Sequence, residues 1–432
     1  MLTENLGINE EGHLTIGGID TISLAKEYGT PLYVMDEDVI RDNCRKFKES
    51  IDKYYDGEGL VCYASKVFCC RAMCKIAIEE KIGLDVASEG ELYTAISVGF
   101  PTDKICLHGN NKSDDELTFA LSHGVGHIVV DNLYELERLN KIAEKLHKKA
   151  NIMFRVKPGI DAHTHSFIQT GQIDSKFGLA LETGEAFEAV KTAISLENVN
   201  LRGLHCHIGS QIFEIEPFEL AAKVMLNFIA KIKNELDYEI SELDLGGGFG
   251  IKYVENDNPP DYEAYMQRVS AVVNSECESL GIKRPFIMIE PGRSIAGPAG
   301  ITLYTAGAVK EIPDIRTYVS VNGGMVDNPR YILYQAEYEA LVANKANEEK
   351  TEVITLAGRC CESGDLIGEN MPIQKVESGD IIAVLATGAY NYSMSSNYNR
   401  LPKPAVVMVK GGKTRIAVKR ETLEDIIRND VV

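Results

Sequence analysis

Short apolar runs alternate with longer amphipathic segments between residues 60 and 290. The runs lie at 60–64, 83–87, 104–107, 127–130, 152–156, 201–205, 242–245 and 286–290. Between them, apolar residues recur at helical spacing, for example at 69–80, 88–98, 132–149, 183–196, 217–236 and 262–280. Eight strand-like runs separated by helices are typical of parallel βαβ units, and their number favours an α/β fold of the (β/α)8 barrel type. An open doubly wound sheet is the competing interpretation of the same pattern.

The pattern changes after about residue 300. Segments such as ITLYTAGAV, TEVITLAG and AVVMVKGG are short, rich in β-branched residues and broken by Gly, Asp or Pro. They predict an antiparallel β-sandwich or β-barrel domain over 301–432. Residues 1–35 contain the strand-like strings HLTIGG and TPLYVMD, so we expect them to join this β domain. The (β/α)8 barrel is then expected over 36–300.

Composition and charge narrow the classes of function. The chain has 432 residues, 44% of them hydrophobic, and a net charge of −19 from 45 basic and 64 acidic residues. This balance is that of a globular protein and argues against a nucleic-acid partner, which needs a basic face. The longest apolar runs, such as IIAVLA, are too short to span a membrane, and the acidic N-terminus does not resemble a signal peptide. Ten cysteines are too sparse for a disulfide scaffold, so we expect a cytoplasmic location.

Polar or glycine-rich residues follow most of the apolar runs, at the strand ends where barrel enzymes carry their active sites. The strings, in chain order, are YASK (63–66), DVASE (85–89), HGNNK (108–112), HCHIGSQ (205–211), GGGFG (246–250) and EPGRS (290–294). Taken alone, a strand-end lysine such as Lys66 is better interpreted as a solvated surface charge. Recurrence at six equivalent positions predicts one active site.

The chemistry of these strings suggests pyridoxal 5'-phosphate (PLP). The glycine run presents backbone N–H groups that suit a phosphate, although a tight structural turn explains it equally well in isolation. Ile251 stands where the dinucleotide-binding fingerprint requires glycine, so that fingerprint is absent. A lysine for covalent attachment and a carboxylate such as Glu290 for the pyridine nitrogen complete the set that PLP needs. Neither His205 and His207, which point to opposite faces of a strand, nor the pair at 163 and 165 predicts a metal site.

The chain resembles the diaminopimelate decarboxylases, a branch of the barrel-type PLP-dependent decarboxylases related to ornithine and arginine decarboxylases. The resemblance covers nearly the whole chain and rests on the strings YASK, DVASEGEL, HGNNKS, GLHCHIGSQ, LDLGGGFGI, EPGRS, NGGMVDNPR, CESGD and GAYNYSMSSNYN. It implies decarboxylation of meso-2,6-diaminopimelate at its D-configured centre to L-lysine and CO2, the last step of lysine biosynthesis. Alternatives are a decarboxylase of the same fold acting on carboxynorspermidine, ornithine or arginine, a PLP racemase, and an inactive regulatory homologue.

The resemblance also implies a role for each matching residue around the cofactor. Lys66 would attach PLP covalently, Asp85 would lie near Lys66, and His207 would stack on the cofactor ring. Glu290 would pair with the pyridine nitrogen. The phosphate would be held by Ser210 and the run from Gly246 through Gly247 to Gly248, with Gly292, Arg293 and Tyr390 also at the cofactor. Arg293 and Tyr390 would in addition contact the substrate.

The implied specificity residues lie in the later half of the chain. Arg330 and Tyr334 would bind the distal carboxylate of the substrate, a role that suits the guanidinium fork. Glu362 would bind the distal ammonium, and Cys361 would be the acid that protonates the α-carbon. In the family these last two residues come from the partner subunit, which implies a homodimer with shared active sites. The segment 160–178 resembles the family's lid, and Arg359 stands where the family usually has proline.

Overall fold

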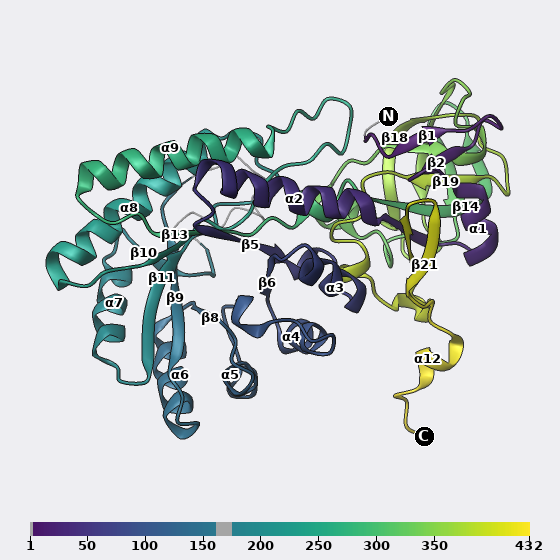
Figure 1. The fold of residues 1–432 in the computed structure, drawn as a ribbon. Helices are drawn as coiled ribbons and strands as arrows, with labels where there is room; N and C mark the ends of the chain where they lie inside the picture. The colour runs from purple at the N-terminus through teal and green to yellow at the C-terminus, as the bar shows by residue number, and fades with distance from the viewer. Residues whose placement is uncertain (1–2, 161–174) are drawn as a thin grey trace. The chain divides into compact units, whose positions relative to one another are not determined.

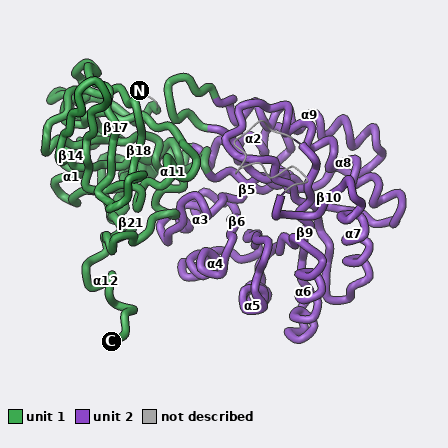
Figure 2. Tube along the Cα trace, turned by 180° about the vertical axis from the view of Figure 1, so that it is seen from behind, with its two compact units in different colours: residues 1–42, 251–258, 293–432 green, residues 43–250, 259–292 purple. Residues whose placement is uncertain are grey.

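The computed structural model describes residues 3–160 and 175–432, and internal contacts divide the chain into two compact units (Figure 2). The β unit comprises residues 1–42, 251–258 and 293–432, and the barrel unit comprises residues 43–250 and 259–292. The boundary at residues 42 and 43 falls within helix α2 (Glu37–Tyr54).

Eight parallel strands close into a barrel. They are β5 (Gly59–Ala64), β6 (Gly83–Val86), β7 (Ile105–Leu107), β8 (His127–Val130), β9 (Ala150–Lys157), β11 (Val199–His205), β12 (Glu242–Asp244) and β13 (Phe286–Ile289). Each strand pairs in parallel with the next one in this order. The pairing of β13 with β5 closes the ring. The predicted (β/α)8 barrel is therefore confirmed, and the open doubly wound sheet is excluded.

Helices lie around the outside of the barrel strands (Figure 1). They are α3 (Arg71–Glu79), α4 (Glu89–Ile96), α5 (Asp114–Ser122), α6 (Leu133–Lys145), α7 (Glu185–Ser195), α8 (Glu216–Leu236) and α9 (Tyr262–Leu280), with the short strand β10 (Leu179–Ala180) beside β9. Three of them begin directly after strand-end loops because Ser88, Ser113 and Asn132 accept a backbone N–H in the first turn. The strand-end loops are thereby anchored at both ends.

The β unit is built around a mixed sheet. Its strands are β4 (Leu32–Asp36), β14 (Gly300–Ile312), β15 (Arg316–Val321), β16 (Ala340–Val342), β17 (Glu352–Ala357), β18 (Leu366–Ile373), β19 (Ile381–Val384), β20 (Ala405–Lys410) and β21 (Lys413–Val418). Most pairs are antiparallel, as expected, but β4 with β20 and β15 with β17 run parallel. The remaining elements are the three-stranded sheet β1 (Leu6–Ile8), β2 (Leu14–Ile16) and β3 (Ile19–Asp20), and the helices α1 (Thr21–Tyr28), α10 (Arg293–Ala296), α11 (Arg330–Tyr334) and α12 (Leu423–Ile427).

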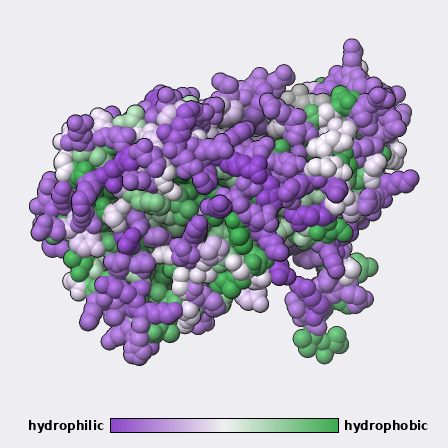
Figure 3. Space-filling model, in the orientation of Figure 1, coloured by the Kyte–Doolittle hydropathy of each residue, from purple (hydrophilic) through white to green (hydrophobic). Residues whose placement is uncertain are grey.

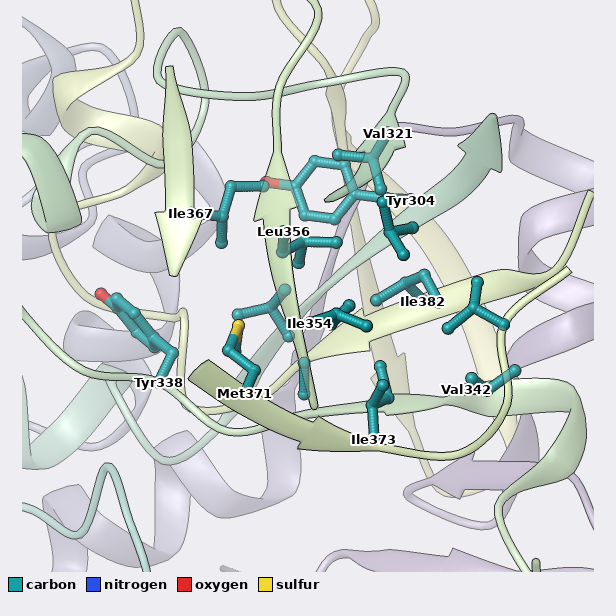
Figure 4. Packing of buried hydrophobic residues seen from close by; sticks show 14 of the residues in the cluster. Tyr304, Val321, Tyr338, Val342, Ile354, Leu356, Ile367, Met371, Ile373 and Ile382 are labelled. Carbon is teal, nitrogen blue, oxygen red and sulfur yellow. The ribbon is translucent and has the colours of Figure 1, made fainter. Parts of the chain in front are cut away.

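Each unit has its own apolar interior. In the β unit, Tyr304, Ile354, Leu356 and Ile382 pack into one cluster (Figure 4). In the barrel unit, Cys62, Cys106, Val129, Met153 and Met288 from five strands form a buried cluster. Each fully buried large side chain of this kind contributes about 1.5–3 kcal/mol, so both units have a substantial apolar driving force.

The face drawn in Figure 3 is mostly hydrophilic, with hydrophobic side chains scattered over it. No helix in the described part of the chain is long and apolar enough to cross a membrane.

Candidate active site

The first barrel strand places a lysine beside a buried aspartate. Strand β5 ends at Ala64, and Lys66 follows in a single 3-10 turn over Ser65–Val67. The Nζ atom of Lys66 lies 3.3 Å from Oδ2 of Asp85, a residue of β6. The Asp85 side chain is 1% exposed and that of Lys66 is 44% exposed. The ammonium is thus held by a buried carboxylate while it remains accessible to a ligand.

A glycine brings a second strand end against this lysine turn. The N–H of Ala64 donates to the carbonyl of Pro291 at 3.2 Å. A Cβ atom on Gly292 would stand 2.5 Å from Cγ2 of Val67 and 2.8 Å from Cβ of Ala64. Because no real Cβ tolerates such distances, the EPGR string needs glycine at this position. Glu290 and Lys66 therefore lie on loops that pack against each other.

The glycine run after β12, here called the glycine cradle, packs closely against the neighbouring strand-end loops. Gly246 and Gly248 have φ angles of +68° and +118°, in the region that favours glycine. The N–H of Gly247 donates to Nδ1 of His207 at 3.3 Å, and a Cβ atom on Gly247 would stand 2.1 Å from the carbonyl oxygen of Glu290. The run is thus closely packed on one side, and only glycine allows that approach.

The loop that carries Ser210 lies beside this cradle. The N–H of Ile212 donates to the carbonyl of Gly248 at 2.9 Å, and the N–H of Gly250 donates back to Ile212 at 3.1 Å. Gln211, next to Ser210, has a φ angle of +60°, an uncommon value for a residue other than glycine. Ser210 and the glycine run therefore share one edge of the barrel, as a phosphate site requires.

His207 presents a neutral ring between these loops. Burial, together with the positive charges of Lys66 and Arg155, holds the pKa of His207 well below its usual range. Since Nδ1 accepts the N–H of Gly247, the proton of the neutral ring is assigned to Nε2. An uncharged imidazole of this kind can stack on an aromatic ligand.

Glu290 is buried between two histidines. Its Oε1 lies 2.6 Å from Nε2 of His108, and its Oε2 lies 3.3 Å from Nε2 of His205. Burial alone would raise the pKa of Glu290, but the two histidines hold it well below its usual range. The pKa of the neighbouring Asp244 is raised well above its usual range by burial and by the charge of Glu290. Of these two buried carboxyl groups, Glu290 carries the negative charge.

These residues fit PLP. The buried Oε1 of Glu290 and Oδ1 of Asp85 have no hydrogen-bond donor aligned with them, so each can accept a donor from a ligand. The glycines of the cradle allow the strand-end loops to approach where a Cβ would not fit, and the Lys66 side chain is 44% exposed. Lys66, Asp85, Ser210 and Gly246–Gly248 would hold the group together with His207 and Glu290.

The β unit contains a second cluster, built around a buried guanidinium. Arg330, at the start of α11, is 7% exposed, and its Cζ lies 5.3 Å from the ring centre of Tyr253 and 5.6 Å from that of Tyr390. Tyr334 follows one helical turn later, with its ring centre 5.8 Å from the same Cζ. Arg330 forms no ion pair with any described carboxylate, and its Nε is buried without a hydrogen-bond partner. A buried cation in this state is suited to an anionic ligand.

Arg293 joins the same tyrosines. Its Nη1 donates to the hydroxyl of Tyr253 at 2.6 Å, and its Cζ lies 4.9 Å from the ring centre of Tyr390. Tyr390 has a φ angle of +60°, which for a bulky residue costs about 1–3 kcal/mol. Such strain is concentrated at functional sites.

The loop that carries Cys361 and Glu362 is held by backbone hydrogen bonds to side chains. Both residues are exposed, and the N–H of Cys361 donates to Oδ1 of Asn399 at 2.7 Å. The buried carboxylate of Asp365 accepts the N–H groups of Met325 and Cys360, each at 2.6 Å. The side chain of Glu362 adds one hydrogen bond within the loop, since its Oε1 accepts the N–H of Gly364 at 3.3 Å.

The departure from the family pattern at Arg359 has a structural counterpart. The N–H of Arg359 donates to the carbonyl of Gly323 at 2.9 Å. Proline has no N–H and could not form this bond. The loop therefore gains one hydrogen bond where the family usually has a fixed φ angle.

The predicted site residues fall into three groups. The barrel unit brings together Lys66, Asp85, His207, Ser210, Gly247, Gly248, Glu290 and Gly292; the β unit brings together Arg293, Arg330, Tyr334 and Tyr390, and separately carries Cys361 and Glu362 on one loop. Of the predicted lid, residues 161–174 lie outside the described residues.

Sequence reasoning assigned no role to several residues of these groups. They are His108, His205, Tyr253, Asp365 and Asn399. Both histidines stand in the strand-end strings, so their position in the sequence could have indicated a role in the site. Tyr253 gave no such signal, because it follows the glycine run by five residues in an irregular segment.

The comparisons with known proteins agree with this geometry. Residues 37–297 match the family described as "Pyridoxal-dependent decarboxylase, pyridoxal binding domain". The fold and the cradle with its lysine thus define a PLP-dependent decarboxylase of the barrel type. The chain is 50% identical to diaminopimelate decarboxylase of Bacillus methanolicus, with 96% of each chain covered. It is 46% identical to that of Bacillus subtilis, with 98% of this chain and 96% of the relative covered.

A solved structure supports the same assignment. Diaminopimelate decarboxylase from M. jannaschii in complex with L-lysine is 34% identical to this chain, with a TM-score of 0.92 over 100% of this chain and 99% of that one. The chain belongs to the diaminopimelate decarboxylase family.

Proposed function

We propose that this protein removes CO2 from the D-configured centre of meso-2,6-diaminopimelate and releases L-lysine, the last step of lysine biosynthesis. Membership of the family and the names of its relatives support the reaction. The pyridoxal-binding domain supports the cofactor.

The observation that carries the substrate assignment is the state of Arg330. A buried guanidinium enclosed by three tyrosine rings, with its Nε unpartnered and no described carboxylate paired with it, needs an anion. Diaminopimelate keeps a second carboxylate at the end remote from the reaction, and lysine retains it. The guanidinium fork can bind that group through two parallel N–H bonds, which Tyr334 would support.

The barrel residues would hold the cofactor and keep its ring nitrogen protonated. When bound, PLP accepts the electron pair that remains on the α-carbon as CO2 leaves. Lys66 attaches the group, and Ser210 with the glycine cradle binds its phosphate. Glu290, ionised between its two histidines, keeps the ring nitrogen protonated, and the neutral ring of His207 packs on its face.

Cys361 delivers the proton that replaces CO2, and Glu362 binds the distal ammonium. We propose that both act in the active site of a second copy of this chain. Their exposure supports this, since both side chains lie on the surface of the single chain. This proposal implies a homodimer with shared active sites, which the family resemblance also implies.

The direct test is turnover by the purified protein loaded with PLP. We expect meso-diaminopimelate to yield CO2 and L-lysine, with the visible absorption of lysine-bound PLP. Lys66→Ala removes the attachment point and should abolish both the band and turnover. If the wild-type protein shows the band but acts on ornithine, arginine or carboxynorspermidine instead, the role of Arg330 is wrong while the cofactor assignment stands.

The shared site is tested with hybrid dimers. Lys66→Ala and Cys361→Ala chains with different affinity tags are co-expressed, and the dimers that carry both tags are isolated. If Cys361 acts in the partner's site, one of the two sites is intact and about half the wild-type activity returns, although each parent is inactive. A hybrid as inactive as its parents contradicts the sharing of sites.

We also propose a reducing, cytoplasmic location. All ten cysteines are free thiols, and all but Cys69 and Cys361 are buried. Thiols of this kind persist where disulfides do not form.

A further inference from the structure

Two histidines flank the Glu290 carboxylate, and nothing in the proposed reaction assigns them a role. His108 follows β7, and His205 is the last residue of β11. They are 6% and 1% exposed, and their rings meet edge to face with centres 4.9 Å apart. Each approaches a different oxygen of Glu290, at 2.6 Å and 3.3 Å. One imidazole nitrogen therefore lies beside each oxygen of the carboxylate.

The barrel strands fix this arrangement through their backbone. The N–H of His108 donates to the carbonyl of Val86, and the N–H of Glu290 donates to the carbonyl of Gly246, both at 2.8 Å. Each bond extends a parallel ladder by one residue beyond the end of its strand. His205 lies within its ladder, in register with Asp244. All three side chains thus project from backbone that cannot shift independently of the barrel.

Without the two imidazoles, the surroundings of Glu290 would oppose its charge. The Glu290 side chain is 4% exposed, and a buried carboxylate with no donor takes up a proton. Two further carboxyl groups lie close by: Asp244, whose pKa is raised by burial and by the charge of Glu290, and Asp85, whose Oδ1 lies 3.7 Å from Nε2 of His108. Neighbouring acidic groups disfavour a negative charge on Glu290. Arg155 supplies a buried positive charge in the same region. A protonated Glu290 could not keep the ring nitrogen of the cofactor protonated.

We propose that His108 and His205 are positioning residues that hold Glu290 as an oriented carboxylate for the ring nitrogen of PLP. This inference rests on the proposed function, since it concerns the same cofactor site. Both histidines act through Glu290 and touch neither the substrate nor the reacting atoms. By burial, the pKa of His205 is lowered to about 4, so at neutral pH this ring is a neutral hydrogen-bond donor.

The barrel supplies a matched control. His127 and Glu242 form a second histidine–glutamate pair, with 2.7 Å between Nε2 and Oε2, at the first residues of β8 and β12. The pair is similar in chemistry and largely buried, but it lies at the opposite ends of the strands. Removing it should affect stability and leave the cofactor untouched.

The experiment measures PLP binding to the apoprotein, separately from turnover. We expect His108→Leu and His205→Leu to weaken PLP affinity by about 10- to 100-fold, the usual effect of losing a residue that orients a ligand. The pH at which the visible absorption spectrum of bound PLP changes should differ between these variants and the wild type. In a Glu290→Gln background the same substitutions should have little further effect on affinity. His127→Leu should lower the melting temperature and leave the affinity for PLP unchanged.

Two outcomes would overturn the inference. If both histidine variants bind PLP as tightly as the wild type, with an unchanged absorption profile, the residues do not position Glu290. If affinity falls by the same factor with and without Glu290→Gln, the histidines have a merely structural role. Failure of the wild-type protein to bind PLP would instead refute the proposed function itself. His108→Gln keeps a hydrogen-bond donor and should recover part of the PLP affinity that His108→Leu loses. This recovery would show that the effect of His108→Leu is not due to misfolding.

Discussion

Replacing Arg330 with methionine is the sharpest test of the substrate assignment. Methionine keeps an unbranched chain of similar length among the tyrosine rings but has no guanidinium. If the distal carboxylate takes two charge-assisted hydrogen bonds of about 1.5–3 kcal/mol each, the loss is about 3–6 kcal/mol. The corresponding fall in kcat/KM is about 10²- to 10⁴-fold. Arg330→Lys keeps the charge without the fork and should lose about half of that free energy.

The stability of the variant should change little. A buried cation that pairs with no carboxylate in residues 3–160 and 175–432 carries a desolvation penalty, which the methionine removes. The three cation–π contacts are lost at the same time. These effects oppose each other, so we expect the free energy of unfolding to stay within about 2 kcal/mol of the wild type. A loss of activity without a loss of stability separates binding from folding.

The assay should include the binding of L-lysine, which retains the distal carboxylate. Competitive inhibition by L-lysine is expected to weaken by a factor similar to that for the substrate, because the same two hydrogen bonds are lost. Arg428→Met is the matched control, since Arg428 is an exposed arginine just after α12 and should leave every constant unchanged. If Arg330→Met leaves both kcat/KM and lysine inhibition unchanged, the guanidinium does not bind the distal carboxylate.

Three further substitutions test other parts of the structure. Gly292→Ala places a Cβ 2.5 Å from Cγ2 of Val67. We expect it to lower the free energy of unfolding by about 1–3 kcal/mol, seen as a lower melting temperature, and to reduce PLP incorporation, seen as a weaker cofactor absorbance. Lys112→Met removes the ammonium that lies 2.7 Å from the buried, 2%-exposed carboxylate of Glu135, and it should lower the free energy of unfolding in urea by about 3–5 kcal/mol. Replacing both Lys112 by Met and Glu135 by Leu should recover most of that loss. Equal stability of the single variant and the wild type would contradict this reasoning. Burial raises the pKa of Asp327 from 3.8 to about 7. The stability that its protonated carboxyl group contributes to the folded state is therefore fully present below pH 4 and is lost as the pH rises through 7. The whole decline amounts to about 4 kcal/mol, of which about 3 kcal/mol falls between pH 5 and pH 8. Asp327→Asn should remove this decline when the free energy of unfolding is compared at pH 5 and pH 8; an unaltered decline would refute it.

The sequence alone was sufficient for the barrel and for the residues at its strand ends. All eight apolar runs became the eight parallel strands, because a strand buried on both faces has no polar alternation to obscure it. The sheet of the β unit was predicted less fully. Its two parallel pairs, β4 with β20 and β15 with β17, join segments distant in sequence, and no local pattern encodes such pairings.

The candidate site divides in the same way. The strings around Lys66, Gly247 and Glu290 are recognisable because each needs a residue type that few others can replace: an amine, a missing Cβ, a carboxylate. The histidine pair at Glu290 was not predicted, although both residues stand in recognised strings. Their role depends on three strands meeting in a closed ring.

The amino-acid sequence therefore determined the class of fold and the cofactor chemistry, and it predicted the residues that carry this chemistry, since periodicity and residue type are local properties. Only the tertiary structure decided which charges exist. The pKa of Glu290 is lowered, that of Asp244 is raised, and Arg330 pairs with no carboxylate among the described residues. These states depend on burial and on neighbours from distant segments, because the free energy of a charge in a protein interior is determined by what surrounds it.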